Sequence, residues 1–491
     1  MKQIILYLVL FFSLSYVSLF AQQGTFLRIY TGGSYEEGIA AFHLPDNTYR
    51  LVGNTGSYGW GNTNVWFLAL DSNANFMWHK TFGIGGLDKA EAAVMDKKGN
   101  IFITGTSSSQ TSMSYQMFLM GVDTVGKLFT HKYYGGSDWD FGHSLCIVND
   151  SLLMLAGESY SYGNGQGDAW MMMTKTNGDS LWSKTIGGMK NDAFFGVEYL
   201  KNFGFAFIGK SKSMGNGSYN PFAYNTNVFG DSIWYWSNID TTDGGFNDLV
   251  FTNDTDIVVV GYQRDTSDLF NDVSVMKLNS NGSLLWNRLS LLYHDESSYS
   301  SVIMDGDSIV ASGYTTAYGH GEKDIDLIQL KNTGGWWIKN IFVGRKKSEY
   351  AYCLSKDTIG GDHYLVVGST DGYGLTHSGI IFMRTNSDLL CDTTPVVDLP
   401  SNYSSVNKNR ISCSVFPNPV SDEINISVNG KQNNTLVIIS LVDNLGKILY
   451  SREIDNSIGV YKIEVSNLAS GVYFIIYDDG INSIRKKIIK Q

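Results

Sequence analysis

Short apolar runs, separated by polar turn residues, recur along most of the chain with one fixed period. A glycine ends one of these runs every 52 residues, at Gly53, Gly105, Gly157, Gly209, Gly261 and Gly313, and a seventh, Gly368, follows after a shift of three. An aromatic residue in a later run recurs at spacings of 51 to 53, at Trp78, Phe129, Trp182, Trp234, Trp286 and Trp337. Two independent landmarks with one period indicate a structural repeat.

Each repeat contains four runs that have the character of β-strands. In the second repeat they cover residues 91–96, 101–105, 116–122 and 127–133, with Gly, Asn, Asp and Ser between them. Some runs are apolar at successive positions, as at residues 170–173, which indicates a sheet covered on both faces. Four strands in a unit of this size predict a β-propeller blade.

The two ends of the repeat region complement each other. The seventh repeat reaches residues 380–385 and then lacks its aromatic strand, whereas a lone strand at residues 25–30 precedes the first repeat. The segment TFLRIYTGG (25–33) matches SLWSKTIGG (180–188). We therefore predict an all-β fold with a seven-bladed β-propeller over residues 22–388, closed by the N-terminal strand. An open β-solenoid is the alternative, but it has no need of complementary ends.

Residues 1–21 have the features of a secretion signal. Lys2 is followed by a mainly apolar run to Phe20, and Ala21 is a small residue suited to cleavage. The alternative is a transmembrane anchor, which Ser13, Ser15 and Ser18 disfavour because they interrupt the run. No other stretch is long enough to span a bilayer, so we expect no membrane span after signal removal.

The charge and the cysteines narrow the classes of function. The 491 residues carry a net charge of −11, which argues against nucleic acid as a partner because such partners require a clustered basic surface. Residues 389–413 are expected to be a linker, and Cys391 and Cys413 bracket it. In an exported protein this pair is compatible with a disulfide or with two separate thiols. Cys146 and Cys353 are expected to be buried core thiols.

Residues 414–491 contain short strands with turns between them, which predicts a small Ig-like β-sandwich. The segments FPNPVSDEINI (416–426), VDNLGKILY (442–450), LASGVYFIIY (468–477) and RKKIIKQ (485–491) resemble the type A C-terminal sorting domain of type IX secretion. The resemblance implies a Bacteroidota source and handling by the type IX secretion machinery. It also implies passage through the periplasm to the medium or to the outer cell surface. An ordinary Ig-like accessory module is the alternative.

The repeats, with their pattern G-x-x-x-W-x-K-x-x-G-G, are similar to uncharacterised β-propeller repeats of secreted bacterial proteins. They are more distantly similar to quinoprotein-type and kelch blades, although kelch units place Gly-Gly before their Tyr and Trp, whereas here the Trp comes first. This resemblance implies no agreed activity, so it assigns no catalytic residue.

Two polar series are expected on one rim, because alternate loops of an antiparallel meander lie on the same side. An acid lies 17 residues before the landmark glycine at Glu36, Asp88, Asp140, Asp192 and Glu296, while Gly244 holds this position in the fifth repeat and Ser348 with Glu349 in the seventh. A second series lies 11 residues after the glycine, at Asn64, Gln116, Asp168, Asn220, Asp272 and Asp324. We expect both series to cap backbone N–H groups, with no metal or cofactor. A Ca²⁺ site on the acids is the alternative.

Aromatic residues in the Gly-rich loops are the candidates for ligand binding, because such side chains offer rigid contact area to a sugar or a peptide. The binding candidates are Tyr58, Trp60, Tyr162, Tyr318, His320 and Tyr373. The alternative is that each tyrosine packs against its own loop. Residues that depart from the repeat also occur at 294–296 and 345–347. No Ser-His-Asp order, HExxH motif or nucleophile elbow is present, so no catalytic residue is predicted.

Three functions are compatible with these patterns. The first is an exported or cell-surface propeller that binds a glycan or a protein without catalysis. The second is an extracellular enzyme, a polysaccharide lyase or hydrolase, with its site on the Gly-rich loop face. The third is a quinone-dependent dehydrogenase. Residues that break the repeat and converge near the axis would favour an enzyme, whereas repeated residues favour a scaffold.

Overall fold

The structure is a computed structural model of the chain. It describes residues 24–59, 61–83, 85–108, 114–238, 243–264, 271–289, 298–316, 318–319, 321–357, 359, 361–391, 396–398, 412–429, 437–443, 448–454, 459–478 and 483–491. The chain divides into two compact units, Met1–Pro400 and Ser401–Gln491. The described residues form strands and turns, and none of these stretches contains a helix that could cross a membrane.

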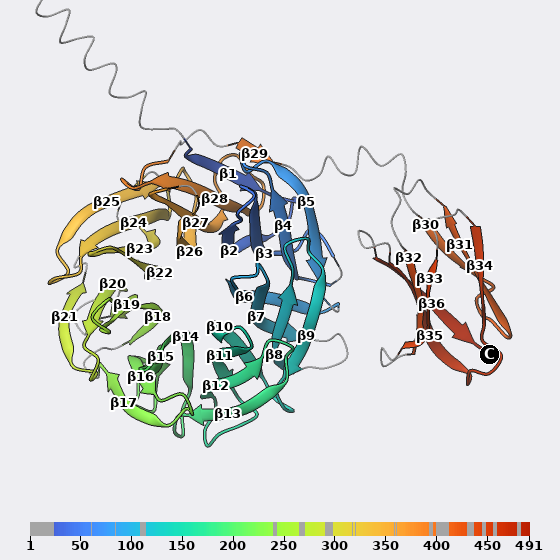
Figure 1. The fold of residues 1–491 in the computed structure, drawn as a ribbon, viewed down its shortest axis with the longest axis horizontal. Coiled ribbons are helices and arrows are strands. Elements are labelled where there is room, and N and C mark those ends of the chain that lie inside the picture. Colours follow the sequence, from blue (N-terminus) through green and yellow to red (C-terminus); the bar gives the residue numbers. More distant parts are fainter. Residues whose placement is uncertain are drawn as a thin grey trace, which may run out of the picture. The chain divides into compact units, whose positions relative to one another are not determined.

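The described strands of the first unit form seven sheets arranged in a ring (Figure 1). Three of the four-stranded sheets contain β2 (Glu36–His43), β3 (Tyr49–Thr55), β4 (Asn64–Leu70) and β5 (Phe76–Phe82); β6 (Leu87–Met95), β7 (Ile101–Ser108), β8 (Tyr115–Val122) and β9 (Leu128–Tyr134); and β10 (Asp140–Asn149), β11 (Leu152–Ser159), β12 (Asp168–Lys175) and β13 (Ser180–Ile186). In each of them the first strand lies nearest the centre of the ring.

Three further four-stranded sheets follow in the same order. They contain β14 (Asp192–Leu200), β15 (Gly204–Ser211), β16 (Asn220–Thr226) and β17 (Ser232–Ser237); β18 (Asp243–Phe251), β19 (Ile257–Arg264), β20 (Asp272–Leu278) and β21 (Leu284–Leu289); and β22 (Ser298–Asp305), β23 (Ser308–Thr315), β24 (Asp324–Lys331) and β25 (Trp337–Val343). The seventh sheet has five strands, in the order β26 (Glu349–Asp357), β27 (His363–Thr370), β28 (Gly379–Asn386), β1 (Phe26–Tyr30) and β29 (Val396–Asp398).

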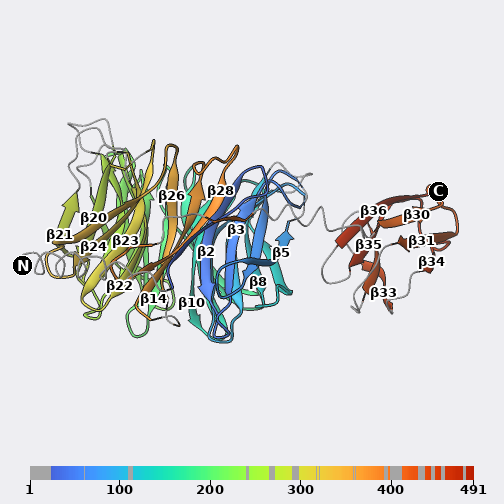
Figure 2. The ribbon, with the colours of Figure 1, turned by 90° about the horizontal axis from the view of Figure 1, so that it is seen from above.

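Burial explains why the middle strands are apolar along their whole length. All seven residues of β4 are buried, whereas every residue of the outer strand β13 is exposed or half-buried. The middle strands are covered on both faces because neighbouring sheets of the ring pack against each other, as the turned view of the ring shows (Figure 2). Continuous apolar runs are the expected pattern for such strands. These features establish the β-propeller fold.

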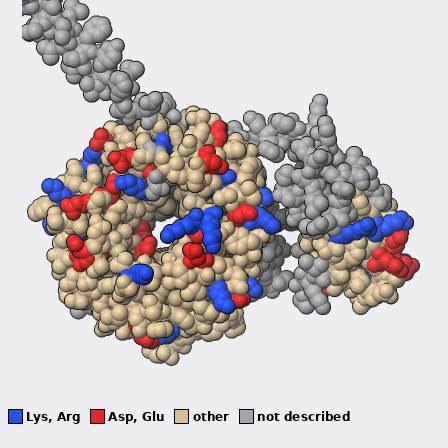
Figure 3. Space-filling view, viewed as in Figure 1, with Lys and Arg blue, Asp and Glu red and all other residues tan. Residues whose placement is uncertain are grey.

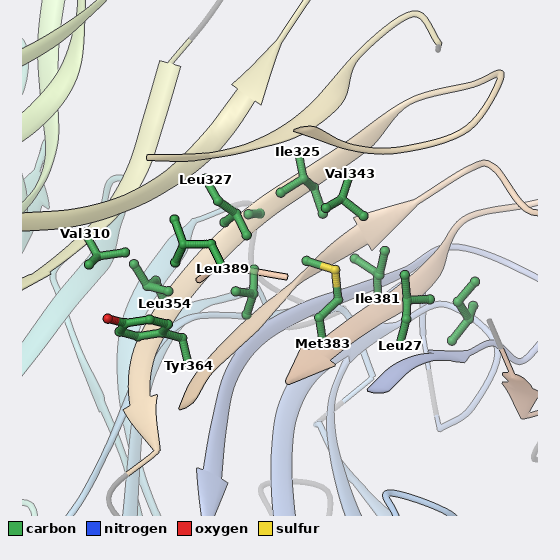
Figure 4. Close-up of a cluster of buried hydrophobic side chains, with 13 residues drawn as sticks. Leu27, Val310, Ile325, Leu327, Val343, Leu354, Tyr364, Ile381, Met383 and Leu389 are labelled. Atoms are coloured by element: carbon green, nitrogen blue, oxygen red, sulfur yellow. The ribbon is translucent and has the colours of Figure 1, made fainter. Parts of the chain in front are cut away.

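The N-terminal strand closes the ring, as the complementary ends predicted. β1 pairs antiparallel with β28, with Phe26 opposite Arg384 and Tyr30 opposite Ile380. Leu27 and Ile29 lie in one apolar core with Ile381 and Met383 (Figure 4). Their burial removes apolar surface from water and holds the strand in the seventh sheet.

The predicted linker contains a strand that the sequence analysis missed. Val396–Asp398 forms β29, which pairs in parallel with β1 on the edge that faces away from β28. The backbone hydrogen-bonding groups of β1 are therefore paired on both sides, although an outer strand usually has one open edge. The segment has only three residues and two adjacent valines, so no period of two could reveal it.

The second unit consists of two antiparallel sheets around one core. Its strands are β30 (Ser412–Phe416), β31 (Glu423–Asn429) and β34 (Gly459–Glu464) in one sheet, and β33 (Ile448–Ile454), β32 (Val437–Val442), β35 (Gly471–Asp478) and β36 (Ser483–Lys490) in the other. Buried residues from both sheets, among them Ile424, Ile463, Leu441 and Ile475, belong to one apolar cluster. A sandwich of two sheets follows from this shared core.

A β-bulge in every inner strand explains the glycine that recurs along the sequence. In the third sheet, Gly142 and Ser144 pair with the consecutive residues Gly157 and Ala156, which leaves His143 as the extra residue. The bulge brings the carbonyl oxygen of Phe141 so close to Gly157 that a Cβ there would lie 1.9 Å from it. The corresponding distance is 1.7 to 2.4 Å at five other landmark glycines, Gly53, Gly105, Gly209, Gly261 and Gly368. Each landmark glycine therefore marks a bulge in the strand beside it.

Candidate functional site

The repeated acids on the inner strands cap the loops that precede them. Asp140 accepts hydrogen bonds from Gly136 N (2.8 Å) and Ser161 Oγ (2.7 Å), and also from Ser159. Asp192 accepts from Gly188 N at 3.0 Å in the same way. Equivalent bonds to Glu36, Asp88 and Glu349 come from Gly32 N, Ser107 Oγ and Arg345 N. The predicted backbone caps are confirmed at Glu36, Asp140, Asp192 and Glu349. Asp88 accepts from a side-chain hydroxyl, and Glu296 lies outside the described residues.

The second polar series caps the Gly-rich loops. Asp168 accepts hydrogen bonds from Asn164 N and Gly165 N, both at 3.1 Å. Asn220 and Asp324 accept from Asn216 N (3.2 Å) and Gly321 N (3.1 Å). These contacts fix the loops but give no ligand site by themselves. Among the described residues, no group of three or more His, Cys, Asp or Glu side chains is placed to hold a metal ion.

The four binding candidates that lie in the described part of the chain each pack within their own sheet. The Tyr58 ring lies 5.4 Å from Trp66, Tyr162 lies 5.7 Å from Trp170 and Tyr318 stacks on Phe342 at 5.1 Å, so each contacts its own sheet. Tyr373 packs against the core of the seventh sheet, with the Arg345 guanidinium 5.6 Å from its ring centre. Trp60 and His320, and the departures from the repeat at residues 294–296, lie outside the described residues.

The cysteines occupy different environments. Cys146 is buried in an apolar core, and burial raises the pKa of its thiol. Cys353 is half-buried and packs against two core clusters. Cys391 Sγ lies 3.9 Å from Met383 Sδ. The side chain of Cys413 lies outside the described residues, so the Cys391–Cys413 disulfide stays a prediction.

The bulge positions combine a repeated geometry with side chains that do not repeat. The extra residue of the seven inner strands is, in chain order, Ile39, Glu91, His143, Phe195, Asn247, Ser300 and Tyr352. Six of the seven are half-buried, which leaves part of each side chain open. Bulges commonly re-aim side chains next to functional sites. These positions direct seven different side chains from the strands that line the centre of the ring.

Two of these positions belong to a continuous aromatic group, the mouth cluster, which lies where the Gly-rich loops meet the second, third and fourth sheets. It consists of Tyr115, Trp139, Phe141, His143, Tyr160, Phe195, Lys210, Lys212 and Tyr219. Phe141 stacks on Tyr115 with 5.5 Å between ring centres, and His143 lies 4.8 Å from Phe195. Trp139, 47% exposed, lies 6.1 Å from Tyr160.

Both lysines of the mouth cluster lie against aromatic rings. Lys210 Nζ is 4.6 Å from the centre of the Tyr219 ring and 5.1 Å from that of Phe195, and Lys212 Nζ is 4.2 Å from the centre of Tyr219. Residues two apart at the end of a strand point to the same side, which explains why both amines reach one ring. The aromatic faces attract the two ammonium groups and hold them in place.

Two polar atoms of this region are buried and make no hydrogen bond within the described part of the chain. One is His143 Nε2, which lies 3.7 Å from Glu158 Oε1, and the other is Asn191 Oδ1. Asn191 Nδ2 approaches the hydroxyls of Tyr160 and Tyr219, at 3.4 and 3.5 Å. Burial raises the pKa of Tyr160 to about 12, with a further contribution from Glu158, so its hydroxyl is a donor at neutral pH. Such unsatisfied groups are available to a ligand or to water.

A second aromatic group lines the same rim in the sixth and seventh sheets. Tyr314 lies 5.2 Å from Tyr350, which stacks on Tyr352 at 5.9 Å. Lys323 Nζ lies 4.4 Å from the centre of the Tyr314 ring. Tyr262 on β19 lies between the two groups, and burial raises its pKa to about 12, with smaller contributions from charges that include Asp243. Aromatic side chains therefore border much of this rim.

Sequence reasoning missed this rim although a signal for it existed. The residue three positions after each capping acid differs in every repeat, as Ile39, Glu91, His143 and Phe195 illustrate. Alternation along a strand does not identify it, because the bulge shifts the alternation by one residue.

Comparison with known proteins identifies the end of the chain. Residues 414–491 match the family model of the secretion system C-terminal sorting domain. The protein is therefore exported, to the cell surface or into the medium. No curated protein matches the chain.

Several solved structures share the ring of sheets. The chain is similar to the WD40 domain of Neurospora crassa Pan2, with 10% identity, a TM-score of 0.45 and coverage of 73% of this chain and 92% of that one. Polysaccharide lyase Uly1 is 11% identical, with a TM-score of 0.44 and coverage of 72% of this chain and 90% of that one. The β-propeller domain of the Trilobed protease from Pyrococcus furiosus is 9% identical, with a TM-score of 0.42 and coverage of 76% of this chain and 99% of that one. At TM-scores below 0.5 these similarities carry no information on activity.

Proposed function

We propose that this chain is an exported binding protein whose propeller holds a ligand at the mouth cluster. In this proposal residues 1–21 are a removable signal, residues 22–388 form seven blades and residues 389–413 connect them to an Ig-like sorting domain at residues 414–491. The source would be a member of the Bacteroidota, and the type IX machinery would be the export partner. The proposal needs no metal or cofactor.

The observation that carries the proposal is the contrast between constant bulge geometry and varied side chains. A repeat conserves what the fold requires, such as the landmark glycine and the capping acid. It has no structural reason to place His143 and Phe195 at equivalent positions of adjacent sheets with their rings 4.8 Å apart. Rigid aromatic groups with unsatisfied polar atoms between them are typical of binding surfaces.

The test is a glycan array and a protein pull-down with the secreted protein, compared with its Phe195→Ala and Trp139→Ala variants. We expect at least one ligand whose binding weakens about tenfold in both variants, because each loses an aromatic face. Tyr235→Ala is the matched control, since Tyr235 is 63% exposed on the outer strand β17. Ligands that bind all four proteins equally would refute the site.

A second candidate is an extracellular enzyme, a polysaccharide lyase or hydrolase, at the same place. The specific observation in its favour is that residues that break the repeat lie on the inner strands, with His143 and Glu158 only 3.7 Å apart. Binding is common to both candidates and is therefore proposed first. Release of new reducing ends from a bound polysaccharide, abolished in His143→Ala, would establish the enzyme instead.

Export is tested separately from binding. Removal of residues 414–491 should leave the protein in the periplasm, because the matched domain carries the sorting information. Fractionation of cells that express the full and the truncated chain measures this. Normal secretion of the truncated chain would contradict the assignment.

A further inference from the structure

We propose that the ligand of the mouth cluster is an acidic polysaccharide, with sugar rings against Trp139, Phe141 and Phe195 and its anionic groups at Lys210 and Lys212. The inference rests on the proposed function and adds the chemical class of the ligand. It follows from three properties of the cluster: its lysines without carboxylate partners, the placement of its amines, and the flat apolar faces that extend along it.

The first property is charge without a carboxylate partner. Several lysines of the ring lie beside an acid, as Lys184 does at 2.8 Å from Asp231 and Lys277 at 3.1 Å from Asp256. Among the described residues no carboxylate lies within ion-pair distance of Lys210 or Lys212. On the face drawn in Figure 3, basic and acidic side chains are likewise interspersed around the ring. Two adjacent amines without acidic neighbours form a local positive site that attracts an anion, although the net charge of the whole protein is −11.

The second property is placement. An exposed lysine normally loses side-chain rotational freedom when a ligand orders it. Here the rings of Tyr219 and Phe195 already hold both amines, so the loss of side-chain freedom when an anion binds is smaller. Both side chains are half-buried, and their contacts are with ring faces rather than with acceptors. The amines keep their hydrogen-bonding capacity for a carboxylate or sulfate.

The third property distinguishes a sugar from a small anion. Trp139, Phe141 and Phe195 provide apolar faces beside the lysines, and the Tyr160 hydroxyl and His143 Nε2 lie among them. A pyranose ring has an apolar face that packs on aromatic rings and hydroxyls that bind polar atoms at its edge. The group extends from β8 to the loop before β16, which suits an extended chain of several sugars.

The other polyanions fit less well. A nucleic acid needs many phosphate contacts spread along a positive surface, and the cluster offers two amines. An acidic peptide would satisfy the amines but has no flat ring to cover Trp139 and Phe141. An exported protein also meets polysaccharides outside the cell.

The experiment is calorimetric titration of the secreted protein with polygalacturonate oligomers, dextran sulfate fragments and neutral dextran, at low and at raised salt. We expect binding of the first two, weakened by salt, and none of the third. The stronger of the two binders identifies carboxylate or sulfate as the recognised group. In the Lys210→Gln/Lys212→Gln double variant we expect binding about a hundredfold weaker and less dependent on salt. The Lys97→Gln/Lys98→Gln double variant is the charge-matched control, because both lysines lie on the hairpin between β6 and β7, at the opposite rim.

Several outcomes overturn the inference. Neutral dextran binding that is lost in Phe195→Ala but kept in the lysine variant would reject an acidic ligand and leave the proposed site intact. Equal binding of polyglutamate or of an oligothymidylate through the same lysines would reject a polysaccharide. Failure of Phe195→Ala to alter the binding of any ligand would reject the site itself together with the inference. Unchanged thermal unfolding of each variant shows that lost binding is not lost folding.

Discussion

Asp140 and His143 lie on the same strand, β10, and represent two kinds of position. Asp140 is fully buried, most other sheets have an acid at the same position, and its carboxylate accepts hydrogen bonds from neighbouring loops. No other sheet has a histidine at the bulge position of His143. This side chain is partly exposed, and its Nε2 makes no hydrogen bond in the described structure. The comparison teaches that the repeated residues build the ring, whereas the residues at the bulges are not required by the repeat, and we propose that they bind the ligand. Four predictions test this division, in order of decreasing effect.

The largest effect is expected at a repeated glycine. Gly157→Ala places a Cβ 1.9 Å from the Phe141 carbonyl oxygen, a backbone atom that cannot move without opening the bulge. We expect the free energy of unfolding to fall by about 3 kcal/mol. Gly245→Ala is the matched control, because the nearest atom to its Cβ lies at 3.4 Å. Denaturant unfolding of both variants measures the difference, and equal losses would contradict the bulge explanation.

The second prediction contrasts the two residues of β10 directly. Asp140→Ala leaves Gly136 N, Ser159 Oγ and Ser161 Oγ without their acceptor, which should cost about 2 kcal/mol of unfolding free energy. His143→Ala removes no hydrogen bond that the described structure contains and should cost less than about 1 kcal/mol. Ligand binding should show the reverse order. A variant pair in which His143→Ala is the more destabilising would break the division.

The third prediction concerns an inner-strand acid that does break the repeat. Asp248 stands where the other sheets have Ala40, Ala92, Ser144, Gly196, Ser301 and Cys353. Burial raises the pKa of Asp248 to about 6, although Val302 N donates to it at 2.9 Å. The folded state therefore binds more protons than the unfolded state between about pH 4 and pH 6. The free energy of unfolding should fall as the pH rises through that window.

Asp248→Asn should flatten this dependence because the amide does not ionise. Urea unfolding of both proteins at several pH values measures it. Desolvation raises the pKa of Glu198 to about 7 with help from Asp248, although its side chain is exposed. Glu198 remains in both proteins and gives a slope of the same sign between about pH 4.5 and pH 7, so the flattening is partial. Parallel pH profiles for the two proteins would contradict the assignment to Asp248.

The smallest effect is expected on removal of metal ions. The described ring acids receive hydrogen bonds from backbone and hydroxyl groups, which stabilise them without a cation. Chelation with EDTA should therefore change the melting temperature little. A large decrease that Ca²⁺ restores would show that the acids hold an ion.

The architecture could be predicted from the sequence because its causes are periodic. Buried middle strands give continuous apolar runs, and the bulge leaves a glycine every 52 residues. The closing role of Phe26–Tyr30 was visible because a strand missing at one end matched a spare strand at the other. The apolar runs and the glycine are local features that recur in every repeat, and the closing strand is recognised by comparison with them.

The candidate site could not be predicted in the same way. Tyr58, Tyr162 and Tyr318 share a loop motif, but the motif places each against its own sheet. Tyr115 and Tyr219 come from different repeats, and only the ring brings their segments onto one rim. Such residues carry no shared pattern, because the fold does not require them.

The pairing of β1 between β28 and β29 also sets the order of events when the protein folds. The first strand to leave the membrane is the last that can find its place, since its neighbours come from the far end of the same unit. Contacts between such distant segments form slowly, because a long loop must close before they stabilise anything. Until Gly379–Asn386 has emerged, β1 lacks its antiparallel partner, and the exported chain remains an open arc rather than a closed ring.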